Sequence, residues 1–121
     1  MNSNASLTDS FKYASFGVLY ALRRNRNLRI HFAIAILVII ASIFFKVNPF
    51  EMGILGIMIL LVISAEMINS AIEEMVDLVT KELKKEAKVA KDVTAGMVLI
   101  TVVGSVIVGV LIFVPHILKF F

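Results

Sequence analysis

Acidic and amide side chains gather in residues 64–77, SAEMINSAIEEMVD, where the chain otherwise reads as a membrane segment. The stretch directly follows the apolar run MGILGIMILLVI. Carboxylates near the edge of a bilayer are costly to keep there and usually serve a function. Their types suit proton transfer and the binding of a divalent cation. The polar residues concerned are Glu66, Asn69, Glu73, Glu74 and Asp77.

Four of these side chains fall on one face if the stretch is helical. At about 100° per residue, Glu73 and Asp77 lie within about 20° of Glu66. Asn69 lies about 60° away, so the stripe extends over roughly 16 Å of helix axis. Glu74 points elsewhere and is expected to be solvated.

Two kinds of chemistry suit this stripe. Glu66 follows the apolar residues 52–65 and is expected inside the inner leaflet, where a carboxylate suits a general base. Glu73 and Asp77 are expected at or beyond the cytoplasmic interface, where carboxylates can hold Mg²⁺ together with phosphate oxygens. A lipid hydroxyl would then arrive from the membrane and a phosphoryl donor from the cytoplasm.

A purely structural role for the stripe is the alternative. Asn69 could hydrogen-bond a neighbouring helix, and Glu73 and Asp77 could pair with lysines of the following loop. For Glu66 this interpretation is weaker, because no basic residue within the spans is expected to be available to neutralise it.

Three apolar runs supply the elements that must position these residues. The runs are residues 30–45, 52–65 and 95–118, and with their flanks they reach the roughly 20 residues that a membrane helix needs. We expect spans at 28–47, 51–79 and 92–118, the second with a cytoplasmic extension. Between the first two, Asn48 and Pro49 in KVNPFE disfavour helix. The predicted fold is an all-α integral membrane protein with a single membrane domain, residues 1–121.

The composition agrees with this fold class. Of the 121 residues, 60% are hydrophobic, and the mean hydropathy is +0.95. An ordinary soluble domain would be more polar, and no room remains for a separate soluble nucleotide-binding domain. The chain has no cysteine, which excludes thiol and cysteine–zinc chemistry.

The basic residues predict the orientation in the membrane. Five precede the first span and five lie between the second and third, while Lys46 and Lys119 lie on the other side, which accounts for all 12. Short loops rich in Lys and Arg stay in the cytoplasm. We therefore expect a multi-pass protein whose N-terminus is cytoplasmic and whose C-terminus is outside.

Residues 6–26 predict an amphipathic helix on the cytoplasmic surface of the membrane. Phe11 and Val18 fall near one helical face, and Lys12 and Arg23 fall on the other. The stretch is too polar to span the bilayer, and its C-terminal end is basic. A helix packed only on the other helices is an equally good interpretation.

The segment KVAKDVTAGMVLI, residues 88–100, opens the third span. Lys91 can neutralise the charge of a phosphate there, and Asp92 can cap or orient. The alternative is that this pair serves only to anchor the span and to start its helix.

Several of these segments together resemble the prokaryotic diacylglycerol kinase family, which includes the undecaprenol kinases of Gram-positive bacteria. EMINSAIEEMVDL resembles the signature E-x-x-N-[ST]-A-I-E-x-x-x-D, and AKDVTAGMVLI resembles the segment A-K-D-x-x-A-x-x-V-L. RNLRIH and SFKYASFGV resemble the start of the family's first span and its N-terminal helix. The resemblance implies a membrane kinase of the bacterial cell membrane with one surface helix and three spans. It further implies a homotrimer with active sites between subunits.

The resemblance also implies roles for individual residues. Glu66 matches the general base, and Glu73 matches a metal-binding glutamate. Asn69 and Asp77 match polar residues around the active site. The implied cofactor is Mg²⁺, with ATP as phosphoryl donor, a membrane lipid as acceptor and no nucleic acid among the partners. The positions that match nucleotide contacts are Tyr13, Glu82, Lys91 and Asp92.

One position departs from the family pattern. Asn25 stands where a glutamate is expected as the second metal ligand, and no acidic residue lies between Asp9 and Glu51 to replace it. An amide oxygen is a neutral and weaker ligand for Mg²⁺. We therefore expect weaker metal binding, or the loss of one ion, and slower turnover.

Three hypotheses about function follow. The first is a lipid kinase acting on undecaprenol or diacylglycerol, with undecaprenol favoured by the RNLRIH and AKDVTAG segments. The second is a catalytically weakened or inactive family member, supported by Asn25. The third is a small proton-coupled exporter. Such proteins typically have four spans and carry their glutamate in the first, so the three spans expected here speak against it.

Overall fold

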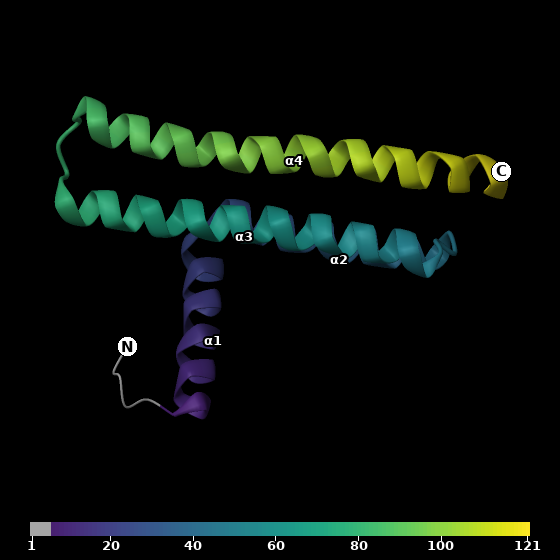
Figure 1. Cartoon of the computed structure of the whole chain (residues 1–121), viewed down its shortest axis with the longest axis horizontal. Helices are drawn as coiled ribbons and strands as arrows, with labels where there is room; N and C mark the ends of the chain where they lie inside the picture. The colour runs from purple at the N-terminus through teal and green to yellow at the C-terminus, as the bar shows by residue number, and fades with distance from the viewer. Residues whose placement is uncertain (1–5) are drawn as a thin grey trace.

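The computed structural model describes residues 6–121 of the chain. This part contains four α-helices and no strand: α1 (Leu7–Arg24), α2 (Arg26–Phe44), α3 (Pro49–Val79) and α4 (Lys85–Phe120). α2, α3 and α4 run along the long axis of the molecule, and α1 leads away from them (Figure 1). The prediction of an all-α fold is confirmed.

The three long helices are apolar enough to cross a membrane. Their most apolar windows have mean hydropathies of 2.1, 2.1 and 2.9. α4 has 36 residues and, at about 1.5 Å per residue, is longer than the hydrocarbon core of a bilayer. It begins at Lys85, seven residues before position 92, where the third span was expected to start. Lys88 and Lys91 therefore belong to a helix rather than to a loop.

Short polar residues begin three of these helices. Ser6 and Asn25 accept backbone N–H groups at the starts of α1 and α2. Asn48 does the same for α3, where Glu51 returns a hydrogen bond to the backbone N–H of Asn48. The expected break in KVNPFE is observed between Phe44 and Pro49, and Asn48 lies outside the helix as its N-cap. Only Pro49 departs from the expectation: it begins α3, because proline has no N–H to lose in a first turn.

Apolar packing holds the end of the bundle that contains Glu51, here named the Glu51 end. Val47, Leu55 and Ile112 form a buried cluster. His116 Nε2 lies 2.9 Å from Glu51 Oε1, which joins α4 to α3. Aromatic rings also pack against one another at this end, from Phe44, Phe45, Phe113 and Phe120. These contacts fix the position of α4 relative to α3.

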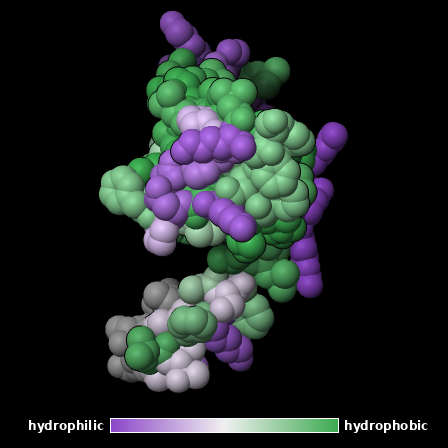
Figure 2. Space-filling view, turned by 90° about the vertical axis from the view of Figure 1, so that its right-hand side faces the viewer, coloured by the Kyte–Doolittle hydropathy of each residue, from purple (hydrophilic) through white to green (hydrophobic). Residues whose placement is uncertain are grey.

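Much of the surface of the three long helices is apolar. Large hydrophobic side chains are exposed on α2 and α4, among them Leu37 and Ile100. Viewed from the right-hand side of Figure 1, hydrophobic residues cover much of the three-helix part, with hydrophilic side chains in a few places (Figure 2). Such a surface is expected of helices that face lipid or other subunits rather than water.

Candidate active site

Glu66 is buried in the middle of α3, with 2% of its surface exposed. Its Oε1 accepts a 2.8 Å hydrogen bond from Nδ2 of Asn25. Its Oε2 lies 3.8 Å from Nε2 of His31, which is longer than a hydrogen bond. The expected base is therefore surrounded by polar groups from the link between α1 and α2 and from α2 itself.

His31 is the residue near Glu66 that sequence reasoning missed. Its side chain is 17% exposed and lies near the start of the first apolar run. The expectation that no basic residue within the spans is available to Glu66 overlooked this histidine, whose Nε2 lies 3.8 Å from the carboxylate. The signal was present in RNLRIH, since an ionisable residue entering an apolar run usually has a polar partner.

Asn25 occupies the link between α1 and α2 and caps α2 with its side chain. Its Oδ1 accepts the backbone N–H of Leu28 at 3.2 Å. Its Nδ2 donates to Glu66 Oε1 and to Ser70 Oγ. The side chain therefore turns its nitrogen, and not its oxygen, toward the carboxylate on α3.

Asn69 joins α3 to α4 about one turn beyond Glu66. It is 7% exposed, and its Oδ1 accepts a 2.6 Å hydrogen bond from Oγ1 of Thr94. Its Nδ2 donates to Glu73 Oε1 at 3.4 Å. The interpretation that Asn69 hydrogen-bonds a neighbouring helix is confirmed. The same residue also orients Glu73, so a structural role and a place in the site are compatible.

Asp77 and Lys91 form an ion pair beyond the apolar runs, with 2.7 Å between Oδ1 and Nζ. The hydrogen bond from Lys91 lowers the pKa of Asp77, and the bond to Asp77 raises the pKa of Lys91. Both side chains are partly exposed, so water screens the pair. Asp77 thus pairs with a lysine, as the structural alternative expected, but this lysine lies in α4 and not in the loop.

Asp92 and Glu82 lie on exposed parts of the chain. Asp92 accepts a 2.6 Å hydrogen bond from Lys88, one turn earlier in α4. Because α4 begins at Lys85, Asp92 does not cap the helix, which corrects one of its expected roles. Glu82 lies in the turn between α3 and α4, where its carboxylate is 3.9 Å from Nζ of Lys84.

α1, which leads away from the long helices (Figure 1), carries Tyr13, and 48% of this residue is exposed. Nearer the bundle, Tyr20 Oη donates to Glu74 Oε1 at 3.3 Å, and Arg24 lies 3.5 Å from the same oxygen. Glu74 is half exposed, as expected, but it is not merely solvated. It joins α3 to α1.

The described residues 6–121 contain no group of three His, Asp or Glu side chains placed to hold a metal ion. Glu73 offers one carboxylate, which suits Mg²⁺ when phosphate oxygens and water complete its coordination. Asn25 suits the ion less, because its Oδ1 already caps α2 and its Nδ2 faces Glu66. Glu73 therefore fits a magnesium–nucleotide site, whereas Asn25 in this conformation does not.

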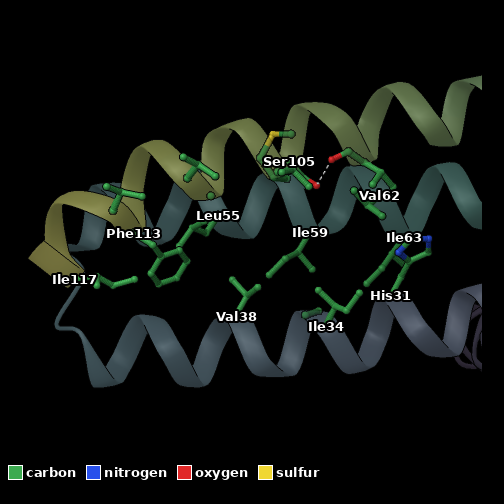
Figure 3. A pocket seen from close by; sticks show the side chains of 17 residues that line it. His31, Ile34, Val38, Leu55, Ile59, Val62, Ile63, Ser105, Phe113 and Ile117 are labelled. Atoms are coloured by element: carbon green, nitrogen blue, oxygen red, sulfur yellow. Dashed lines mark hydrogen bonds between the residues drawn. The ribbon is translucent and has the colours of Figure 1, made fainter.

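An apolar cavity of about 470 Å³ lies between α2, α3 and α4. His31 lines it at one end, and Phe113 and Ile117 line it toward the Glu51 end (Figure 3). Ile34, Val38 and other aliphatic side chains line the stretch between them. The cavity therefore leads from the neighbourhood of Glu66 along the bundle, and its lining suits a hydrocarbon chain.

Comparison with known protein families matches most of the chain to one family. A family described as prokaryotic diacylglycerol kinase matches residues 12–113. The chain belongs to the prokaryotic diacylglycerol kinase family. The resemblance predicted from the motifs is thereby confirmed.

Two relatives illustrate the range of the family. To the diacylglycerol kinase of Synechocystis sp., the chain is 38% identical over 115 residues. This matched stretch covers 94% of this chain and 66% of that protein. The chain is 39% identical over 106 residues to the undecaprenol kinase of Bacillus subtilis. This matched stretch covers 88% of this chain and 86% of that protein. The chain thus spans slightly less than two thirds of the Synechocystis protein. The two relatives are named for different lipid acceptors, and their identities to this chain are nearly equal.

Proposed function

We propose that this protein transfers the γ-phosphate of ATP to the primary hydroxyl of a membrane lipid, undecaprenol or diacylglycerol. The observation that carries the proposal is Glu66, a buried carboxylate beside His31, which lines one end of an apolar cavity. A carboxylate in this place can take the proton from a lipid hydroxyl whose hydrocarbon chain lies in the cavity.

In the proposed reaction Glu66 acts as the general base. The hydroxyl oxygen of the lipid attacks the γ-phosphorus, the O–H proton passes to the Glu66 carboxylate, and the bond from phosphorus to the leaving ADP oxygen breaks. Phosphoryl transfer depends chiefly on positioning and on the neutralisation of phosphate charge. Lys91 supplies positive charge, and its 2.7 Å contact with Asp77 holds the ammonium group in place.

Mg²⁺ belongs to the proposal as the companion of ATP. Glu73 would hold the ion together with phosphate oxygens of the nucleotide, and the ion would offset their negative charge. The hydrogen bond from Asn69 to Glu73 supports this role, because it orients the carboxylate.

The nucleotide is proposed to bind on the exposed side of Glu73, against Lys91 and Asp92. Tyr13 and Glu82 are further proposed contacts, and both are accessible to a ligand. Because Tyr13 lies on a helix that leads away from the bundle, we propose that neighbouring copies in a homotrimer complete the site. The exposed apolar side chains of α2 and α4 support such an association.

The proposed location is the bacterial cell membrane, with the N-terminus in the cytoplasm and the C-terminus outside. The distribution of basic residues supports this orientation. We propose that α1 lies on the cytoplasmic surface of the bilayer. It leads away from the long helices and exposes Phe11 and Phe16, which suits insertion among lipid headgroups.

Undecaprenol is the favoured acceptor. The match to the relative named undecaprenol kinase extends over more of that protein, 86%, than the match to the relative named diacylglycerol kinase, 66%. The second candidate is a catalytically weakened family member, and Asn25 is the observation that favours it.

Transfer of label from ATP to lipid tests this proposal. The purified protein in mixed micelles would receive Mg²⁺, γ-labelled ATP and either undecaprenol, diacylglycerol or no acceptor. We expect labelled lipid with undecaprenol in excess of diacylglycerol, and none without an acceptor. A preference for diacylglycerol would keep the kinase and change its substrate. The absence of label in both lipids would contradict the proposed activity.

A further inference from the structure

The side chain of Asn25 is held at both its oxygen and its nitrogen. Its Oδ1 accepts the backbone N–H of Leu28 in the first turn of α2, where no intrahelical acceptor exists. Leu28 is completely buried, so this N–H group has no access to water. The Leu28 N–H needs an acceptor, so the oxygen end of the amide faces α2 and the nitrogen end faces Glu66. Chemistry therefore fixes the orientation of the amide.

Both hydrogens of the Asn25 amide are directed at α3. One hydrogen bond goes to Glu66 Oε1 at 2.8 Å, and the other goes to Ser70 Oγ. Glu66 and Ser70 are four residues apart and therefore lie on the same helical face. This arrangement joins the link between α1 and α2 to α3 at the height of the proposed base.

The contact makes the two oxygens of Glu66 unequal. Oε1 is engaged by Asn25, whereas Oε2 faces Nε2 of His31 at 3.8 Å. Among the described residues, no hydrogen bond to Oε2 is observed. His31 lines the apolar cavity, so Oε2 is the oxygen of Glu66 that faces a cavity-lining side chain.

We propose that Asn25 is a positioning residue for Glu66 in this protein and not a ligand of Mg²⁺. Its amide holds Oε1 so that Oε2 is presented to the acceptor hydroxyl beside His31. The inference rests on the proposed lipid kinase function and gives position 25 a different task from the metal binding implied by the family resemblance.

The two roles of position 25 predict effects of opposite sign. If Asn25 were a weak metal ligand, a carboxylate in its place would strengthen metal binding and raise activity. If Asn25 positions Glu66, a carboxylate removes the donor and adds a second negative charge beside the base.

Asn25→Asp separates the two roles without removing the helix cap, since Asp is as good an N-cap as Asn. At saturating Mg²⁺ and ATP, we expect lipid phosphorylation by Asn25→Asp to fall about 10- to 100-fold, with the Mg²⁺ concentration for half-maximal activity unchanged. Asn48→Asp is the matched control, because Asn48 caps α3 in the same way at the Glu51 end. Its activity is expected to stay within about twofold of the wild-type value.

The hydrogen bond can also be observed without turnover. In protein carrying ¹⁵N-labelled asparagine, the Asn25 side-chain amide resonance is expected to move more on substitution Glu66→Gln than on addition of Mg²⁺ with ATP. A response to Mg²⁺ that equals or exceeds the response to Glu66→Gln would overturn the proposal. An Asn25→Asp variant as active as the wild type, or more active, would overturn it too.

These results are distinguishable from a failure of the proposed function. If the wild-type protein labels no lipid but the Asn25 resonance still responds chiefly to Glu66→Gln, the positioning contact stands and the lipid kinase proposal fails. If the wild-type protein labels lipid and Asn25→Asp labels it equally well, the kinase stands and the positioning role fails.

Discussion

α3 carries two glutamates that each lie beside a histidine, and the two pairs differ in construction. At the Glu51 end, Glu51 Oε1 lies 2.9 Å from His116, and the same oxygen accepts the backbone N–H of Asn48. In the middle of α3, Glu66 Oε2 stays 3.8 Å from His31. The Glu51 side chain is 25% exposed, whereas that of Glu66 is 3% exposed. Closer contact thus occurs where the surroundings are more open.

The difference separates a structural joint from a site. Glu51 is engaged in helix capping and in a bond between two helices, which leaves its carboxylate little capacity for a ligand. Glu66 has one oxygen bonded to Asn25 and another that faces His31, a side chain that lines the cavity. Residue type alone does not distinguish these pairs, since both combine the same two side chains. Burial and the number of partners on each oxygen distinguish them.

Removing single carboxylates beyond Glu66 on α3 tests how far the site extends from the structural joint. Glu73→Gln is expected to lower lipid phosphorylation on the order of 100-fold and to raise the Mg²⁺ concentration that half-maximal activity requires, because a neutral amide binds Mg²⁺ weakly. Steady-state assays over a range of Mg²⁺ concentrations would measure both. Glu74→Gln, one residue further on, is the control and is expected to keep its Mg²⁺ dependence. Equal Mg²⁺ curves for Glu73→Gln and the wild type would exclude Glu73 as a ligand.

Two lysines of α4, Lys91 and Lys88, are expected to differ in their effect on the KM for ATP, and this effect is smaller than that of Glu73. Lys91→Met is expected to raise the KM for ATP about tenfold, because a charged contact to phosphate is lost. Lys88 makes a similar ion pair one turn earlier, at 2.6 Å from Asp92, and has no assigned contact with the nucleotide. Lys88→Met is therefore expected to change the KM by less than about twofold. Identical changes in the two variants would contradict the assigned role of Lys91.

Polar contacts between α3 and α4 at the two regions can be compared directly. Thr94→Val removes the 2.6 Å bond to Asn69, and His116→Leu removes the 2.9 Å contact with Glu51. Each substitution is expected to cost about 0.6 kcal/mol of stability, a typical value for hydrogen bonds between membrane helices, as measured by SDS-induced unfolding in mixed micelles. Only Thr94→Val is expected to lower activity as well, by a few-fold, because Asn69 orients Glu73. Loss of activity in His116→Leu but not in Thr94→Val would contradict the assignment of the Glu51 end as structural and of the Asn69 contact as part of the site.

The smallest expected effect is a pH-dependent one at the Asp77–Lys91 pair. The pKa of Asp77 is lowered by its hydrogen bond to Lys91, so the pair stabilises the fold above the ordinary pKa of aspartate. This contribution is lost as pH falls through the lowered pKa of Asp77. Asp77→Asn is therefore expected to unfold slightly more easily than wild type at neutral pH, and the difference should vanish in strong acid. Unfolding curves at several pH values would measure it, and a difference that grows toward low pH would refute this account.

The sequence predicts the helices and the polar stripe well, because both follow from periodicity. Apolar runs of sufficient length give α2, α3 and α4, and helical spacing alone places Glu66, Asn69 and Glu73 on one face. The buried states of Glu66 and Asn69 agree with that face.

Contacts between helices are the part that the sequence did not predict. The approach of His31 to Glu66 depends on how α2 meets α3, and periodicity within one helix carries no information on that. The orientation of Asn25 likewise depends on two partners, Leu28 and Glu66, that lie on different helices. The start of α4 at Lys85 was missed because its first turns are polar and do not resemble a membrane span.

The most direct test of the central claim compares Glu66→Gln with Glu51→Gln in the transfer of label from γ-labelled ATP to lipid. Both changes are isosteric, and both remove a carboxylate that lies beside a histidine. The account predicts that Glu66→Gln loses about 1,000-fold or more of the activity, since proton transfer to the base is abolished, and that Glu51→Gln stays within about twofold of wild type. Retention of activity in folded Glu66→Gln protein would contradict the assignment of Glu66 as the base.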